Sequence, residues 1–576
     1  PEDIRCIDPC MGSGHILVYM FDVLMQIYTS QGYIERDAAS LILQNNLYGL
    51  DIDDRATQLA YFAVMMKARQ YDRRFFSRNV QPHVYAVPET KGKLSACSHE
   101  FGLGEQLYSA FHDGKEYGSL LDIGMDEAEL NLLKMHIDDM LINGDMTDIA
   151  AANVVAPLWD VAIALTQKYD AVITNPPYMG ATGMSSTLSE YVKAKYPDSK
   201  SDFFSCFIER GIEMLRTNGL ESMITMESWM FLSSFEKLRA KINTHTIINM
   251  VHMPYLGKGG TSLGINFGTE MSIIQNKRVA GYNATYDRIA YYETDDDGIP
   301  FEFPVRNEYY RVAQQENFSR IPGAPVAYWV SEGYYDAFIN GKPLSEVSTI
   351  FEGLKTRDKD RFVRLWFEVA NDIWKPYAKG GSFRRWYGNN EYVVKWGIDG
   401  REIRNFKKSS GANFKFYNQP TVTYGALTSY KFSGRYIDSS FFGGGGGGIT
   451  NCNEIWNVLA FVNSIVYHHI INAISPTLNF EVGQIGQQPY LMTEGARKEV
   501  AEIARENVSL SRADWDAFET SWDFKRHPLV RFAQGQSMPR LSDCFKAWDE
   551  ECAERFNHLK ANEEELNRIF IDIYGL

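Results

Sequence analysis

The feature that most constrains the fold is the alternation of short apolar runs with helix-length segments through the first half of the chain. DIRCIDPC, NLYGLDID and YDAVITNPPY are each followed by a helix-length segment, at 16–28, 55–69 and 203–215 respectively. Strands that alternate with helices predict a mostly parallel sheet with helices on both faces, which is an α/β fold. Ligands of such folds bind beyond the carboxyl ends of the strands, so polar residues there are the first candidates for a site.

The later sequence departs from this pattern and predicts further domains. A chain of 576 residues is too long for one hydrophobic core. We expect a catalytic domain in 1–280, a polar, Tyr-rich connector in 281–345, a mixed α/β region in 346–492 and a charged, helical C-terminal region in 493–576. Within the first domain, 78–118 is predicted to be a surface insertion, because Pro, Gly, Ser and His interrupt the periodicity there.

Charge and cysteine content bound the possible functions. The net charge is -15, so wholesale coating of nucleic acid is not expected, although a local basic surface could still bind it. The seven cysteines lack paired spacing, so we expect neither a disulfide framework nor a metal site, and a reducing cytoplasm is the simplest location. No apolar run approaches the roughly twenty residues that span a bilayer, so no membrane association is expected.

Aspartates are expected at three strand ends. Asp8 precedes a glycine loop whose backbone could approach a ligand closely beside a helix N-terminus. Asp51 follows the second strand, where a carboxylate could accept hydrogen bonds from two ribose hydroxyls, while a helix N-cap at Asp53 or Asp54 is the competing interpretation of the same segment. A third strand, MLINGDM, is predicted to present Asp145 at its end, where an ordinary turn aspartate is the alternative.

The motifs DPCMGSG, LDID, NGDM and NPPY, in this order, resemble those of adenine-N6 DNA methyltransferases. The resemblance implies S-adenosyl-L-methionine as the cofactor, S-adenosyl-L-homocysteine as its product, a Rossmann-like sheet and no metal. It also implies that the glycine loop surrounds the methionine moiety, Asp51 holds the ribose and Asp145 contacts the adenine of the cofactor. Cys10 and Met11 depart from the usual loop, but both glycines remain. The implied cofactor residues are Asp8, Pro9, Gly12, Ser13, Gly14, Asp51, Ile52, Asp145 and Met146.

In this family resemblance the catalytic tetrapeptide is Asn175, Pro176, Pro177 and Tyr178. The side-chain oxygen of Asn175 and the carbonyl of Pro176 would accept the two hydrogens of the adenine amine and aim its lone pair at the methyl group. The prolines would hold these acceptors rigidly, and Tyr178 would stack on a base flipped out of the duplex. Phe267 is the candidate for the other wall of the base pocket. Methyltransferases of glutamine amides and RNA bases share the tetrapeptide, so it specifies a planar amine rather than DNA.

A basic segment after Gly353 favours DNA as the substrate. FEGLKTRDKDRF resembles the start of the target-recognition domain of fused restriction-modification enzymes, with Arg357 where Gly is usual and Lys359 where Asn is usual, so the turn could differ. Residues 472–491 resemble the end of that domain. A solvated, β-rich face is the alternative for this segment. The expected phosphate-binding residues are Lys355, Arg357, Lys359, Arg361, Arg384, Arg385 and Lys395.

More narrowly, GSGHILVYMF, NNLYGLDIDD and NPPYMG resemble the adenine methyltransferases of BREX phage-defence systems. This implies double-stranded DNA as a partner, other BREX proteins as candidate partners, and marking of host DNA as self. Two alternatives stay open: the modification part of a type IIG restriction-modification enzyme, and a DNA-binding scaffold that retains a methyltransferase fold. In this class an N-terminal element precedes the glycine loop, so a chain that truly started at Pro1 would be expected to bind the cofactor weakly and methylate little.

Overall fold

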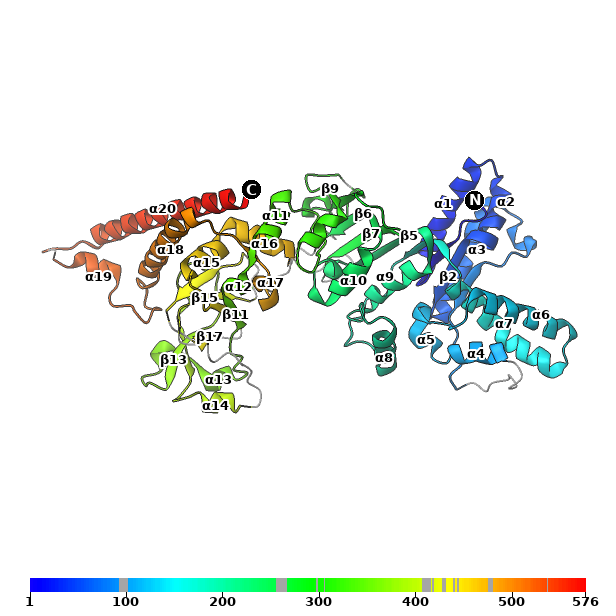
Figure 1. The fold of residues 1–576 in the computed structure, drawn as a ribbon, viewed down its shortest axis with the longest axis horizontal. Helices are drawn as coiled ribbons and strands as arrows, with labels where there is room; N and C mark the ends of the chain where they lie inside the picture. Colours follow the sequence, from blue (N-terminus) through cyan, green and yellow to red (C-terminus); the bar gives the residue numbers. More distant parts are fainter. Residues whose placement is uncertain are drawn as a thin grey trace. The chain divides into compact units, whose positions relative to one another are not determined.

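The computed structural model describes two compact units, Pro1–Phe318 (unit 1) and Ser319–Leu576 (unit 2), which are coloured blue to green and green to red in Figure 1. The described residues are 1–92, 102–254, 267–296, 299–304, 306–406, 416, 419–426, 431–438, 441–442, 445–474, 480–535 and 537–576.

Unit 1 is built on a mixed sheet in which the described strands number nine, in the order β3-β2-β1-β4-β5-β7-β6-β8-β9. From β3 to β5 every neighbouring pair is parallel, β7 is antiparallel to both of its neighbours, and β8 is parallel to β6. This arrangement, together with unit 2, confirms the predicted α/β class. The strands are β1 (Cys6–Asp8), β2 (Leu47–Asp51), β3 (His83–Ala86), β4 (Tyr169–Thr174), β5 (Leu215–Met226), β6 (Thr246–Met253), β7 (Thr269–Gln275), β8 (Asn283–Arg288) and β9 (Arg311–Gln314).

Helices of unit 1 pack on this sheet through apolar stripes. Leu17, Phe21, Leu24 and Tyr28 recur at helical spacing on α1, are buried, and belong to one apolar cluster with Val64 of α3. The cluster anchors α1 directly behind the glycine loop. The helices are α1 (His15–Ser30), α2 (Glu35–Leu41), α3 (Asp54–Tyr71), α4 (Gly102–Ala110), α5 (Gly114–Tyr117), α6 (Glu127–Asn143), α7 (Met146–Thr166), α8 (Ser186–Lys195), α9 (Phe203–Met214) and α10 (Glu236–Ile242).

The strand predicted to end at Asp145 is wrong. MLINGDM spans the end of α6, the linking Gly144 and the start of α7, so it joins two helices. Its apolar residues continue the helical period of α6, and a short apolar run alone does not distinguish that period from a strand. Two further regions contain strands that were not predicted. The stretch 78–118, predicted to be a surface insertion, contributes the edge strand β3. The first part of 281–345, predicted to be a connector, contributes β8 and β9 to the large sheet.

Helix α7 is long and apolar enough to cross a bilayer by length and composition, and no other helix of the described ranges is. Its buried residues, among them Val155, Leu158 and Val161, face the interior of unit 1, and the indole of Trp159 donates a hydrogen bond to the Leu130 carbonyl of α6 (2.7 Å). A core helix of a folded domain has these properties.

Unit 2 combines small sheets with a helical layer, as predicted. Its described strands form a sheet ordered β11-β18-β15-β16, a second ordered β12-β14-β13-β17, and the pair β10-β19. They are β10 (Lys342–Pro343), β11 (Thr349–Glu352), β12 (Val363–Leu365), β13 (Trp374–Ala378), β14 (Tyr392–Lys395), β15 (Thr421–Gly425), β16 (Gly434–Ile437), β17 (Phe441–Phe442), β18 (Gly446–Thr450) and β19 (Pro489–Tyr490).

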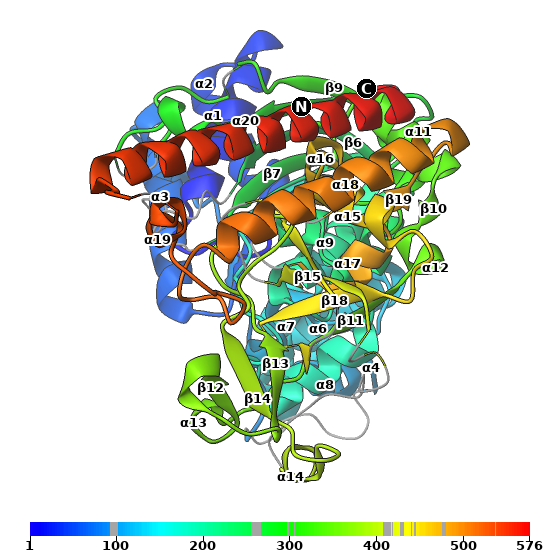
Figure 2. The same ribbon diagram turned by 90° about the vertical axis from the view of Figure 1, so that its left-hand side faces the viewer.

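The C-terminal helices of unit 2 cover its larger core. Figure 2 shows α18 and α20 running side by side, and Phe461 of α15 contacts Phe570 and Tyr574 of α20 beneath them. The helices are α11 (Glu332–Asn340), α12 (Leu344–Val347), α13 (Lys359–Phe362), α14 (Arg401–Arg404), α15 (Ile455–Asn463), α16 (Ile465–Ile474), α17 (Val482–Gly486), α18 (Glu494–Trp515), α19 (Pro528–Ala533) and α20 (Leu541–Tyr574).

Candidate functional site

The glycine loop between β1 and α1 has the geometry that glycine permits. Gly12 and Gly14 have φ of +52° and +85°, in the left-handed region that residues with a Cβ disfavour. A Cβ on Gly14 would lie 2.9 Å from the Cα of Ala60, so glycine also allows α1 and α3 to approach closely. No side chain caps the N-terminus of α1. The loop therefore leaves backbone amides of α1 without a capping side chain.

Asp51 connects the end of β2 to this loop. Its Oδ2 accepts a hydrogen bond from the Gly12 amide (2.9 Å), and its Oδ1 accepts one from the Asp53 amide (2.8 Å). The N-cap of α3 is Asp53, whose carboxylate accepts from the Arg55 amide (2.8 Å). The two interpretations of this segment thus apply to different residues: Asp53 caps the helix, and Asp51 retains lone pairs for a ligand.

Asp8 is buried and ties β1 to β4. Its Oδ1 accepts hydrogen bonds from the Thr174 hydroxyl (2.7 Å) and the Cys10 amide (3.1 Å), while Oδ2 is buried without a partner among the described residues. Burial raises the pKa of this carboxyl from 3.8 to about 7, against the lowering effect of these two hydrogen bonds. Asp8 therefore holds the start of the glycine loop, through the Cys10 amide, against the end of β4.

The Asn-Pro-Pro-Tyr motif follows β4 at the centre of the sheet. The Tyr178 hydroxyl lies 2.8 Å from Asn175 Oδ1 and 2.9 Å from the Ile224 carbonyl of β5, both of which can accept its proton. Pro176 is buried, whereas Asn175 is exposed. The Tyr178 ring meets that of Phe267 edge to face, with centroids 5.4 Å apart. Asn175 and Tyr178 are thus held together, and Phe267 packs beside the motif; its role as a wall of the base pocket stays a prediction.

A pocket of about 310 Å³ opens between the glycine loop and this motif. Several predicted residues line it, and the remainder of its wall comes from the segment before α6 and from α9. Gly12, Ser13 and Gly14 form the adjoining loop, and Ser13 bonds His15 (3.0 Å). The lining residues are Pro9, Cys10, Asp51, Ile52, Glu116, Tyr117, Gly118, Ser119, Asn175, Pro177, Phe203 and Phe207.

Seven of the twelve residues that line this pocket were not among the predicted site residues. Ser119 is buried and donates a hydrogen bond to the Pro9 carbonyl (2.6 Å), and Tyr117 stacks on Tyr191 of α8 with centroids 4.0 Å apart. Phe203 and Phe207 lie one turn apart on α9. The helical spacing of the two phenylalanines was visible in the sequence, but the position of 116–119 depends on an interrupted stretch interpreted as an insertion.

Asp145 and Met146 do not reach the pocket. Asp145 is the N-cap of α7 and accepts hydrogen bonds from the Thr147 (2.7 Å) and Asp148 (2.9 Å) amides. Met146 is 89% exposed. Neither residue lines the pocket, so the structure does not support the expected contact of Asp145 with the cofactor's adenine. Tyr117, Gly118 and Ser119 line the pocket instead.

Comparison with known proteins shows what the chain is similar to. Residues 45–256 match the family model described as Eco57I restriction-modification methylase. The adenine-specific methyltransferase PglX of Lacticaseibacillus casei (strain Zhang) is 36% identical over 632 residues, which cover 100% of this chain and 51% of PglX. BrxX, an adenine-specific methyltransferase of Escherichia coli O9:H4 (strain HS), is 33% identical, with 100% and 50% covered. This chain is similar to PglX and BrxX over its whole length. It spans about half the length of these relatives.

The similarity to PglX and BrxX runs through both units. Solved structures extend the likeness at the level of the fold: the type IIL restriction-modification enzyme MmeI in complex with DNA has a TM-score of 0.55 at 10% identity, covering 100% of this chain and 70% of that one. The type ISP enzyme LlaGI with a DNA substrate mimic has a TM-score of 0.50 at 12% identity, covering 88% and 44%.

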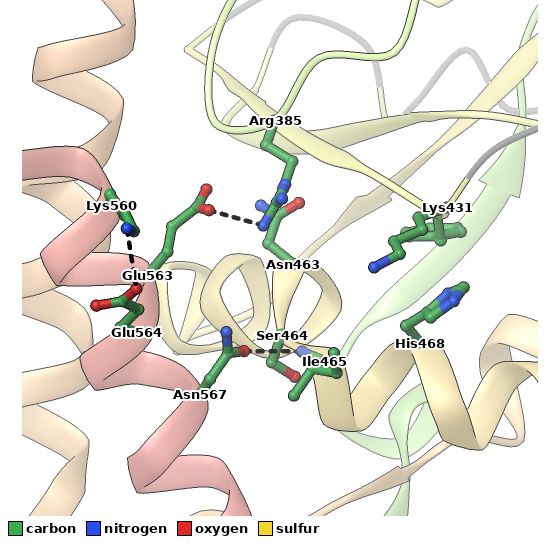
Figure 3. A pocket seen from close by; sticks show the side chains of 11 residues that line it. Arg385, Lys431, Asn463, Ser464, Ile465, His468, Lys560, Glu563, Glu564 and Asn567 are labelled. Carbon is green, nitrogen blue, oxygen red and sulfur yellow. Dashed lines mark hydrogen bonds and ion pairs between the residues drawn. The ribbon is translucent and has the colours of Figure 1, made fainter. Parts of the chain in front are cut away.

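Five of the seven expected phosphate-binding residues form intramolecular ion pairs. Arg361 and Lys395 share Glu402 (2.8 and 2.9 Å), and Lys355 pairs with Glu352. Arg384 pairs with Asp514 of α18 (3.4 Å) and Arg385 with Glu563 of α20 (3.0 Å). Figure 3 shows Arg385 pointing at Glu563 across a pocket of about 230 Å³. Arg384 and Arg385 therefore hold the C-terminal helices.

Arg357 and Lys359 differ from these five residues. No carboxylate of the described residues forms an ion pair with either side chain, and both side chains are exposed. Arg357 has φ of +60°, in the left-handed region that glycine adopts more readily than arginine.

Proposed function

We propose that this protein is an adenine-N6 DNA methyltransferase that uses S-adenosyl-L-methionine. The observation that carries the proposal is that Asn175 and Pro177 of the catalytic motif line the same pocket as Asp51. A carboxylate suited to ribose hydroxyls and an amide suited to a planar amine thus face one cavity. The names of the full-length PglX and BrxX relatives agree with this function.

The pocket suits the cofactor in size and donors. Cys10 and Ile52 supply apolar wall, Asp51 retains acceptor capacity on both oxygens, and the neighbouring loop approaches without side chains at Gly12 and Gly14. When bound, the cofactor supplies a methyl group that is already activated by a sulfonium cation. The chain's own part is therefore orientation and electrostatics, without a metal or covalent attachment.

We propose that Asn175 accepts one hydrogen of the adenine amine through Oδ1 while the Pro176 carbonyl accepts the other. Oδ1 lies within hydrogen-bond distance of the Tyr178 hydroxyl, which also lies close to the Ile224 carbonyl. Because an amide oxygen has two lone pairs, Oδ1 can accept a hydrogen of the substrate while the Tyr178 hydroxyl continues to orient it. Tyr178 and Phe267 then supply aromatic surface for the flipped base.

Replacement of Asn175 tests the proposed function. In Asn175→Ala we expect methyl transfer to adenine in duplex DNA to fall by at least about 100-fold, because the amine loses an oriented acceptor, while DNA affinity stays within about twofold. Transfer of labelled methyl and fluorescence anisotropy measure the two quantities. Asn153→Ala, an exposed asparagine of α7, is the matched control. Normal adenine methylation by Asn175→Ala would refute the mechanism.

We further propose that methylation marks host DNA as self in BREX defence, with other BREX proteins as partners in the cytoplasm. The support is the resemblance of the glycine loop, LDID and NPPY segments to BREX methyltransferases. Long-read methylation mapping of a host with and without the full-length gene tests this role: loss of methylation at one adenine motif is expected. An unchanged methylome would favour a scaffold that retains the methyltransferase fold.

A further inference from the structure

A second, larger pocket lies in unit 2, in the turn that follows β11. Its volume is about 780 Å³, and its wall is formed by residues 354–360, β13 and its neighbour Lys379, Val363, Phe406 and Gly445. It belongs to the part of unit 2 that contains β12, β13, β14 and α13 (Figure 2). No step of the proposed methyl transfer uses this pocket.

The charges that line this pocket are mainly positive. Four cationic side chains and only two carboxylates line it: Lys355, Arg357, Lys359 and Lys379 against Asp358 and Asp360. Asp358 is already engaged, because it caps α13 by accepting from the Arg361 amide (3.1 Å). Across the described residues, no carboxylate lies within ion-pair distance of Arg357, Lys359 or Lys379. The pocket therefore carries excess positive charge that the described chain does not neutralise.

Two of these cations sit in positions that are unfavourable for the protein alone. Arg357 has the left-handed backbone conformation, which glycine would adopt without strain. Burial and the charge of Lys359 lower the pKa of Lys379, although the contact of its ammonium with the Tyr392 ring, 4.3 Å from the centroid, is itself favourable. Strained backbones and repelling like charges are typical of sites that bind a ligand of opposite charge.

We propose that Arg357, Lys359 and Lys379 bind the phosphodiester backbone of the DNA substrate in this pocket. The proposal rests on the proposed function, since it needs DNA as the substrate. It assigns backbone binding to these three residues, while Arg384 and Arg385 keep their structural role beside α18 and α20. Phosphate contacts fix the register of a protein on the duplex and contribute affinity that depends on salt.

The test compares the salt dependence of DNA binding. Duplex affinity is measured by fluorescence anisotropy between about 50 and 200 mM salt for the protein and for Arg357→Gly, Lys359→Gln and Lys379→Gln. Each variant should lower the slope of log affinity against log salt by about 0.9. Arg357→Gly is informative because glycine suits the local backbone, so a loss of affinity in this variant does not reflect misfolding. Lys498→Gln on α18, 87% exposed, is the matched control and should keep the slope of the unmodified protein.

The outcomes separate this inference from the proposed function. If the unmodified protein binds and methylates DNA but the three variants keep its slope, the inference is overturned and the proposed function stands. If the unmodified protein does not bind duplex DNA, both fail. Titration with inorganic phosphate is the second arm: phosphate binding that the three variants lose, with unchanged DNA affinity, would show a small-anion site and overturn the assignment to DNA.

Discussion

At the scale of single residues, the hydroxyl of Tyr178 is the group whose role is least evident from the motif. An aromatic ring alone would suffice to stack on a base, yet this hydroxyl lies between Asn175 Oδ1 and the Ile224 carbonyl. It links the catalytic amide to β5, a strand that lies on the far side of β4 from the glycine loop. We therefore attribute two functions to Tyr178, stacking through the ring and orientation of Asn175 through the oxygen.

Tyr178→Phe separates these functions. The variant keeps the ring but loses the hydrogen bond that orients Asn175, so we expect the methylation rate at saturating substrates to fall about fivefold, the equivalent of about 1 kcal/mol. Single-turnover methyl transfer measures it. Tyr178→Ala, which also loses the ring, should fall much further and should weaken DNA binding. Equal losses in the two variants would contradict a separate role for the hydroxyl.

At the scale of elements, the junction between α6 and α7 allows a direct test of the corrected site. Asp145→Ala should lower the melting temperature by about 2–4 °C, because the helix loses its N-cap hydrogen bonds, and should leave the affinity for S-adenosyl-L-methionine unchanged. Thermal unfolding and isothermal titration calorimetry measure the two effects. Asp51→Ala is the comparison and should weaken cofactor binding. Cofactor affinity lost to the same extent in both variants would place Asp145 in the pocket after all.

Elements with strong local patterns could be predicted from the sequence, and so could the parts of the site that lie within them. The strand, glycine loop and helix from Cys6 to Ser30, and β4 with its Asn-Pro-Pro-Tyr end, follow from apolar periodicity and from residues that stop it. The wall formed by Tyr117 and Ser119 could not be predicted, because it depends on contacts with α8 and the glycine loop.

The same dependence on contacts with distant parts of the chain explains why the ion pairs of Arg384 and Arg385 could not be predicted from the sequence. Arg384 and Arg385 have the composition of a DNA-binding surface, but their partners Asp514 and Glu563 lie more than a hundred residues later in the chain. A local charge count cannot distinguish a cation that folding neutralises from one that stays free. Arg357 and Lys359 stand in the same segment and stay without an ion-pair partner among the described carboxylates.

At the scale of the whole molecule, buried carboxyls make stability depend on pH. Glu270 on β7 is buried against Thr225, Trp229 and Ser272; burial raises its pKa from 4.5 to about 7, and these hydrogen bonds oppose the shift. Glu221 on β5 is buried too, and its pKa is raised by burial and by Glu270. A carboxyl with a raised folded-state pKa binds more protons in the folded than in the unfolded state, so stability is lost as pH rises through about 4.5 to 7.

Glu270→Gln removes this dependence at one site, because glutamine resembles the protonated carboxyl. The free energy of unfolding of the variant should be close to that of the unmodified protein at pH 4.5 and should exceed it above pH 7, by about 3 kcal/mol at most for a shift from 4.5 to about 7. Urea unfolding at both pH values measures the difference. A variant that is equally destabilised at both values would mean that Glu270 stabilises the fold as a charged group.

The hydrogen bond between Asp8 and Thr174 also affects the order in which parts of unit 1 can fold during synthesis on the ribosome. Its partners are 166 residues apart in the chain, although β1 and β4 are neighbours in the sheet. At a synthesis rate of about 5–20 residues per second, roughly 8 to 30 s separate the emergence of the two strands. Throughout that interval the nascent glycine loop lacks this hydrogen bond, so the loop can be tied to the centre of the sheet only after β4 has emerged.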